Sequence, residues 1–152
     1  MTESDKRYYL NFPFVGVGVV VWKDNEFLLI RRGKEPMKGA WSIPGGRQNL
    51  GETIKEAAIR EIREETGLEI HITGLIDVID SIRNDDKGVI AWHATLVDYA
   101  ARHVSGEAVA GDDALSVGWF TLDDLEELGL WGETARIIRE SAQISITRSP
   151  KL

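Results

Sequence analysis

The chain of 152 residues contains no cysteine. Disulfide bonds, thiolate metal sites and a cysteine nucleophile are therefore excluded. Long apolar runs are also missing, because the longest, Phe12 to Trp22, has 11 residues and includes a proline and two glycines. A run of that length is too short to span a bilayer. The segment Met1 to Asn11 is polar and lacks the apolar core of a secretory signal, so we expect a cytoplasmic protein without a membrane partner.

Positive charge is in deficit, since 18 Lys and Arg face 25 Asp and Glu and leave a net charge of −7. Such a chain repels phosphate backbones at long range, so polymeric nucleic acid is not an expected partner. The simplest interpretation of the charge is solubility. If the substrate is nonetheless a phosphate ester, a divalent cation would have to reverse the sign locally.

The composition is that of an ordinary globular protein, with 43% hydrophobic and 28% charged residues. We expect one domain over residues 1–152, with a core at about 14–141 and tails at 1–11 and 143–152. Hydrophobic patterns and turn signals predict strands at 14–22, 26–31, 41–44, 68–79, 89–99 and 117–120. They predict helices at 53–66, from Thr121, and at 133–141, and a loop at 102–116. This order favours an α/β (α+β) fold in which a mixed β-sheet carries helices on both faces.

The predicted helix at 53–66 has one apolar stripe, which consists of Ile54, Ala58 and Ile62. Glu61 and Glu65 lie within or beside this stripe, and Glu64 lies about a turn-width away. Carboxylates at this spacing repel one another, and partial burial raises the cost unless something compensates for it. Protonation, arginine partners or a hard cation would do so, and oxygen ligands of this kind suit Mg²⁺ or Mn²⁺.

A second interpretation of the same glutamates needs no ligand. They would form a solvated acidic face with ion pairs to Arg60 and Arg63, which is common on helices. Lys55, Glu56 and Arg63 point to the far side of the helix on either interpretation.

The residues around this helix fit a longer pattern, G-x5-E-x7-R-E-U-x-E-E-x-G-U, in which U is a bulky aliphatic residue. The fixed positions are Gly46, Glu52, Arg60, Glu61, Ile62, Glu64, Glu65, Gly67 and Leu68. The pattern is the Nudix box, and the chain resembles the Nudix hydrolase family over about residues 14–140. The lead-in WSIPGG and the later stretch VGWFTLDDL are similar to the family's sequences as well. The resemblance implies a Nudix-type α/β/α sandwich.

The resemblance also implies a Mg²⁺ site, which Mn²⁺ would also fit. Its ligands would be Glu61, Glu64, Glu65 and the carbonyl of Gly45. Glu61, Glu64 and Arg60 are then catalytic candidates, and one of the three glutamates would serve as general base. Arg60 and Glu52, together with Gly46 at the start of the box, would support and orient the metal ligands.

Family members often supply a further acidic residue from the loop before the last strand. Here that loop contains Gly111-Asp112-Asp113-Ala114. The resemblance makes Asp113 the first candidate for this catalytic acidic residue and Asp112 the second. The alternative is an ordinary surface turn, since aspartate beside glycine is frequent in turns.

Three residues are candidates for contact with the remainder of the substrate. Arg31 and Arg32 follow the second predicted strand and would contact phosphate, unless they are solvated charges at a sheet edge. Trp41 would stack on a base, although a tryptophan in a strand is more often part of the core.

The function implied by the resemblance is Mg²⁺-dependent hydrolysis of a nucleoside diphosphate linked to another group. The runs VGVGVVVW, LLIRRG, WSIPGG and GDDA resemble bacterial ADP-ribose pyrophosphatase-like members, so ADP-ribose or a nucleotide sugar is the favoured substrate. One alternative is a nucleoside triphosphate diphosphatase, and another is a non-catalytic nucleotide-sensing module. The apolar segment Leu128-Gly-Leu-Trp131 allows a homodimer.

Overall fold

The computed structural model describes residues 6–35, 37–111 and 113–147. Its strands are β1 Phe14–Lys23, β2 Glu26–Arg32, β3 Trp41–Ser42, β4 Gly45–Arg47, β5 Glu69–Asn84, β6 Ile90–Ser105 and β7 Ala114–Phe120. Its helices are α1 Ile54–Thr66, the 3₁₀ turn η1 Leu122–Asp124 and α2 Gly132–Thr147.

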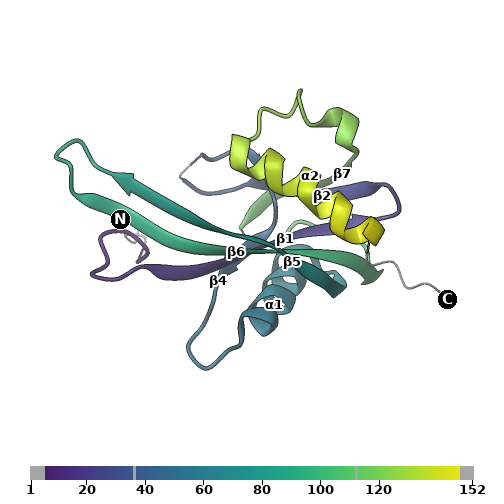
Figure 1. The fold of residues 1–152 in the computed structure, drawn as a ribbon, viewed down its shortest axis with the longest axis horizontal. Coiled ribbons are helices and arrows are strands. Elements are labelled where there is room, and N and C mark those ends of the chain that lie inside the picture. Colours follow the sequence, from purple (N-terminus) through teal and green to yellow (C-terminus); the bar gives the residue numbers. More distant parts are fainter. Residues whose placement is uncertain (1–5, 36, 112, 148–152) are drawn as a thin grey trace.

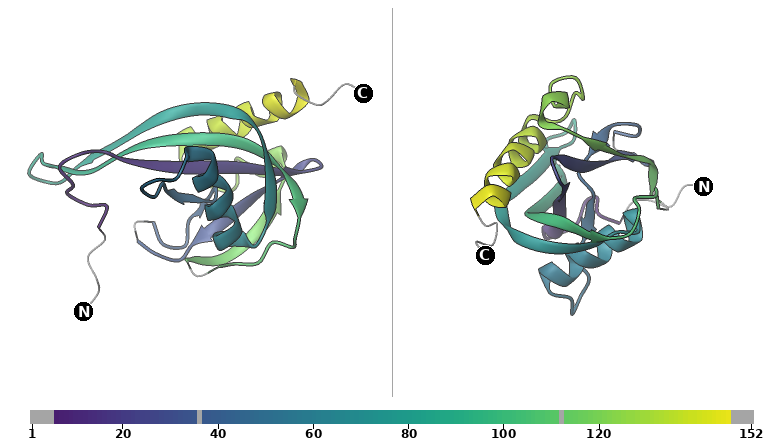
Figure 2. Two further views of the ribbon diagram at one scale, coloured as in Figure 1. Left: turned by 90° about the horizontal axis from the view of Figure 1, so that it is seen from below. Right: turned by 90° about the vertical axis from the view of Figure 1, so that its right-hand side faces the viewer.

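The strands form one mixed sheet with β1 at its centre. The order along the main path is β3-β2-β1-β6-β5, while β4 also pairs with β1 and β7 also pairs with β2. The pairing of β1 with β6 is parallel, whereas the other pairings are antiparallel. The helices α1 and α2 lie on opposite sides of the strands (Figures 1 and 2). The predicted mixed sheet between helices is therefore confirmed.

Two apolar clusters hold the helices against the sheet. On one face, the valines of β1 at positions 17, 19 and 21 pack with Ala58 and Ile62 of α1. On the other face, Val20 and Trp22 pack with Ile137 and Ile138 of α2. Glycines at positions 16 and 18 of β1 alternate with the valines. Because successive residues of a strand point to opposite faces, the face of β1 toward α2 has no side chain at these two positions.

Local signals set the ends of α1. Thr53 and Glu56 form a reciprocal capping box at the start of the helix. Gly67 ends it in the left-handed conformation, with φ of 76°, and donates its N–H to the carbonyl of Arg63 at 2.9 Å. The helix predicted at 53–66 is confirmed, and its face toward solvent carries Lys55, as predicted.

The predicted ends of two strands were wrong. The strand predicted to stop at residue 79 continues as β5 to Asn84, and the predicted loop at 102–116 is strand as far as Ser105. The two strands pair along their length through several register shifts, one of them at Gly74. The turn-like residues inside these segments therefore form β-bulges and do not end the strands. The resulting hairpin extends well beyond the helices (Figure 1).

Two predictions near the C-terminus also differ from the structure. The predicted helix from Thr121 is a single 3₁₀ turn, although the carboxylate of Asp124 does accept the backbone N–H of Thr121 at 2.8 Å. The predicted tail is helical up to Thr147, and residues 148–152 lie outside the described residues. In the described part of the chain, no helix is both long and apolar enough to cross a membrane.

Candidate active site

Glu65, in the last turn of α1, faces the short strand β4. Its Oε2 accepts the backbone N–H of Gly45 at 2.9 Å. A side chain at residue 45 would overlap the carbonyl oxygen of Val17 in β1, so only glycine at this position permits β4 to lie this close to β1. Burial raises the pKa of Glu65 to about 7, and the nearby charges of Glu61 and Asp113 add to the effect. The carboxylate is thus held in place by the backbone while it lacks a full solvent shell.

Glu61 lies one turn earlier on the same face of α1, against Gly46. A Cβ atom at residue 46 would overlap the carboxylate of Glu61, which therefore occupies the space that this glycine leaves. Burial raises the pKa of Glu61 too, although Arg60 opposes the shift. Two desolvated carboxylates at i and i+4 consequently face the same segment, β4.

Arg60 connects the acidic residues around this site. Its Nε donates to Glu52 at 2.6 Å, and its Nη1 donates to Glu61 at 2.9 Å and to Glu64 at 3.1 Å. Its Nη2 donates to Glu52 and to the carbonyl of Arg47, both at 2.9 Å. The hydrogen bonds from Arg60 lead the causes that lower the pKa of Glu52 to about 2. One guanidinium thus fixes the box glutamates relative to β4.

Part of the ligand-free interpretation is also correct. The side chain of Glu64 is 61% exposed and pairs with Arg60. Arg63, however, pairs with Glu69 of β5 at 2.6 Å rather than with a glutamate of the helix. Of the glutamates in α1, only Glu61 and Glu65 are therefore partly buried, and both lie on the inner side of the helix.

The donor set suits a hard divalent cation. Glu61 and Glu65 offer carboxylate oxygens whose burial cost a cation would offset, and cysteine is absent from the chain. Within residues 6–35, 37–111 and 113–147, no three acidic or histidine side chains already converge on one point. Glu64 would join the other two after rotation of its side chain away from Arg60.

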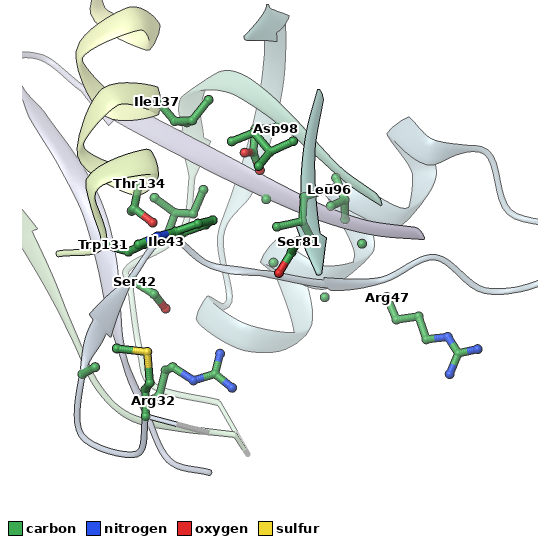
Figure 3. A pocket seen from close by; sticks show the side chains of 18 of the residues that line it. Arg32, Ser42, Ile43, Arg47, Ser81, Leu96, Asp98, Trp131, Thr134 and Ile137 are labelled. Carbon is green, nitrogen blue, oxygen red and sulfur yellow. The ribbon is translucent and has the colours of Figure 1, made fainter. Parts of the chain in front are cut away.

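A cavity of about 540 Å³ opens beside Glu65. Its walls come from all the strands except β7 and from both α-helices, and Figure 3 shows many of their side chains. Four arginines line it: Arg7, Arg32, Arg47 and Arg83. Three carboxylates, Glu65, Asp80 and Asp98, line it as well, so the four arginines slightly outnumber the acidic residues in a chain of net charge −7, and they suit a phosphorylated ligand.

The predicted residues divide into two groups. Arg32, Trp41, Gly45, Gly46 and Glu65 line the cavity together. The structure does not bring Arg31 there, because neighbouring residues of a strand point to opposite faces. The Nε of Arg31 instead donates to the carbonyl of Gly39 at 3.0 Å, and its guanidinium lies over the ring of Trp41. Trp41 itself also packs edge-on against Phe120, with ring centroids 5.0 Å apart.

Asp113 lies in a loop that is tied to the end of α1. The N–H of Gly111 donates to the carbonyl of Glu65 at 2.8 Å, and the N–H of Val109 donates to that of Thr66 at 2.9 Å. The carboxylate of Asp113 is 61% exposed and pairs with Lys34 at 2.8 Å. Its charge is close enough to raise the pKa of Glu65. Asp112, the second candidate, lies outside the described residues.

Arg7, Arg47, Arg83 and Asp98 line the cavity as well, although the sequence did not predict them as site residues. Arg7 and Arg83 both lie over the ring of Trp92, at 4.9 and 4.8 Å from its centroid. The glycines at alternate positions of β1 were the available signal. A side chain at Gly18 would overlap Asp98 and one at Gly16 would overlap Leu96, so these glycines leave room for two side chains that line the cavity.

A helix that presents partly buried carboxylates beside an arginine-lined cavity is an arrangement that suits a hydrolase of phosphate anhydrides. Residues 13–140 match the model of the NUDIX domain, and the chain belongs to this family of hydrolases.

Two similar proteins support this membership, and a third shares the fold. It is 40% identical to the ADP-ribose pyrophosphatase of Methanocaldococcus jannaschii over 122 residues, which are 80% of this chain and 69% of that protein. A MutT NUDIX hydrolase from Burkholderia pseudomallei is 32% identical, with a TM-score of 0.74 over 86% of this chain and 98% of that one. The NUDIX domain of Shewanella oneidensis NrtR, solved with ADP ribose, shares the fold at 21% identity, with a TM-score of 0.68 over 94% and 98% of the two chains.

Proposed function

We propose that the chain is a Mg²⁺-dependent pyrophosphohydrolase that cleaves the diphosphate of a nucleoside diphosphate linked to another group, with ADP-ribose or a nucleotide sugar as substrate. The observation that carries the proposal is the position of two partly buried carboxylates of α1: Glu65 lines a cavity that four arginines also line, and Glu61 packs against Gly46 in the wall of that cavity. The similarity to the Methanocaldococcus jannaschii ADP-ribose pyrophosphatase supports the choice of substrate.

Glu61, Glu64, Glu65 and the carbonyl of Gly45 would hold the metal. When bound, Mg²⁺ supplies charge neutralisation at the diphosphate and makes a water molecule easier to deprotonate. The contribution of the chain is to position these oxygens, which it does through the N–H of Gly45 and the guanidinium of Arg60. Arg32 and Arg47 line the cavity and would bind phosphate oxygens.

Asp113 is proposed as the residue that accepts the proton of the attacking water, with Glu64 as the second candidate. Both side chains are 61% exposed, so water reaches them. The loop of Asp113 is hydrogen-bonded to the end of α1, which keeps this residue near Glu65. Asp113→Asn should then lower kcat more than it raises KM, and an unchanged kcat would transfer the role to Glu64.

A purified sample should be incubated with Mg²⁺ and ADP-ribose, nucleotide sugars, dinucleotides and nucleoside triphosphates, with products separated by chromatography. The expected products from ADP-ribose are AMP and ribose 5-phosphate. EDTA and the Glu65→Gln variant are the controls, and both should abolish turnover. Failure to hydrolyse any compound of the panel would overturn the proposed activity and favour the non-catalytic sensing module.

A nucleoside triphosphate diphosphatase is the second candidate, since a putative 8-oxo-dGTP diphosphatase of Bacillus subtilis is 36% identical to the chain over 69 residues, which are 45% of the chain. The same panel separates the two, because this activity releases a nucleoside monophosphate and pyrophosphate from triphosphates.

We also propose a homodimer. Trp131, at the end of the apolar segment that begins at Leu128, is 51% exposed and would lie in the dimer interface. Light scattering behind a sizing column tests the proposal, and a mass near the 17.0 kDa of one chain would contradict it.

A further inference from the structure

Asp98 of β6 is a buried carboxylate that the proposed hydrolysis does not use. It is 5% exposed, and it lines the cavity below α2. Within the described part of the chain, burial and the charges of Asp77 and Arg136 act on this carboxylate, but no residue donates a hydrogen bond to it. A buried carboxylate without a donor is costly, and such groups are characteristic of ligand sites.

The surroundings of Asp98 are apolar on most sides. Ile43, Leu96 and Ile137 line the cavity near it, and Trp131 and Thr134 complete this end. In Figure 3, Asp98 lies beside Ile137 near α2, whereas Arg32 and Arg47 lie at two other margins of the pocket. The arginines, Glu65 and Asp80 also line the cavity, and Asp98 lies among apolar side chains at the end below α2.

We propose, on the basis of the function above, that this end of the cavity binds the nucleobase and that Asp98 selects bases with an exocyclic amino group. An N–H donor would supply the hydrogen bond that Asp98 lacks within the protein. Flat apolar walls and the exposed indole of Trp131 suit a planar ring. A sugar is a poorer fit, because most of its hydroxyl groups would face Ile43, Leu96 and Ile137 without a partner.

The glycines of β1 support this assignment. Any side chain at Gly18 would overlap the carboxylate of Asp98 and approach Ile43 at 2.8 Å. Gly18 thus makes room for the carboxylate beside the central strand, at the cost of a glycine in a strand interior.

The test is binding of nucleoside monophosphates to the full chain by calorimetry, without any need for turnover. Three pairs are compared: GMP and IMP differ by an amino group alone, whereas AMP and IMP, and CMP and UMP, differ by an amino group in one member against a carbonyl oxygen and a ring N–H in the other. Wild-type protein should bind the amino member of at least one pair about ten-fold more tightly. Asp98→Asn should remove that preference, because its amide also donates to a carbonyl oxygen. Asp86→Asn, an equal change of charge at an exposed turn, should retain it.

Equal affinities within all three pairs for the wild-type protein would overturn the proposal, whether or not Asp98→Asn folds. A preference that persists in a folded Asp98→Asn variant would overturn it as well. The result is independent of catalysis: a protein that discriminates AMP from IMP but hydrolyses nothing keeps this inference and loses the proposed function. Conversely, turnover of ADP-ribose without discrimination against its hypoxanthine analogue keeps the function and removes the role of Asp98.

Discussion

The carboxylate of Glu61 fills the space that a side chain at Gly46 would need. This relationship couples the first glycine of the box to a glutamate 15 positions later, and it makes the size of one residue a condition for the position of the other. The glycine is therefore required for reasons of packing.

Gly46→Ala should displace Glu61 and weaken its hydrogen bond with Arg60. We expect at least a ten-fold loss of kcat/KM and a loss of about 1–3 kcal/mol in the free energy of unfolding. Kinetics and urea unfolding measure the two effects. Gly132→Ala is the matched control, because a Cβ atom there meets nothing within 4 Å. Equal activity of the two variants would show that Glu61 can move without consequence.

Arg60→Ala should affect both stability and catalysis. It leaves the partly buried Glu52 and Glu61 without their shared cation and the carbonyl of Arg47 without a donor. We expect a loss of about 2–3 kcal/mol in urea unfolding, together with a large decrease in kcat. The control is Arg63→Ala, which breaks a more exposed pair with Glu69 and should cost less than about 1 kcal/mol. Similar costs for the two arginines would contradict the central role of Arg60.

Glu64→Gln and Glu65→Gln should each lower turnover by about two orders of magnitude or more while the far-UV circular dichroism stays that of the wild type. The amide removes a charged oxygen from the proposed metal ligands but keeps the size of the side chain. Lys55→Ala, on the exposed face of α1, should change turnover less than two-fold. Near-full activity of either glutamine variant would remove that glutamate from the proposed ligands.

Asp98 should make stability depend on pH. Burial and the charge of Asp77 raise its pKa from 3.8 to about 6, against a smaller opposite effect of Arg136. The folded state therefore binds a proton that the unfolded state has lost, and stability falls as the pH rises from about 4 to 6. Above that range, Asp98→Asn should be more stable than the wild type by up to about 3 kcal/mol.

Unfolding in urea at pH 4 and pH 8 measures this effect, with Asp86→Asn as the exposed control. The advantage of Asp98→Asn should be present at pH 8 and nearly absent at pH 4. An advantage of the same size at both values would mean that ionisation of Asp98 is not its cause.

Local patterns in the sequence determined the helix and its chemistry. Thr53 and Gly67 mark the ends of α1 through hydrogen bonds within a few residues, and the spacing of Glu61 and Glu65 places both on its inner side. The hairpin of β1 and β2 follows in the same way from a short turn between two apolar runs. Such features depend on neighbours close in the chain, so they can be predicted before any packing is known.

Only the tertiary structure decided which other residues meet the glutamates. Arg31 and Arg32 are equivalent in sequence, but the face of β2 sends one toward Gly39 and the other into the cavity. Asp98 lies in a strand whose end was predicted too early, and it became a cavity residue because β1 places Gly18 beside it. Strand register and the approach of α2 set these contacts across many residues, and no local propensity encodes such distances.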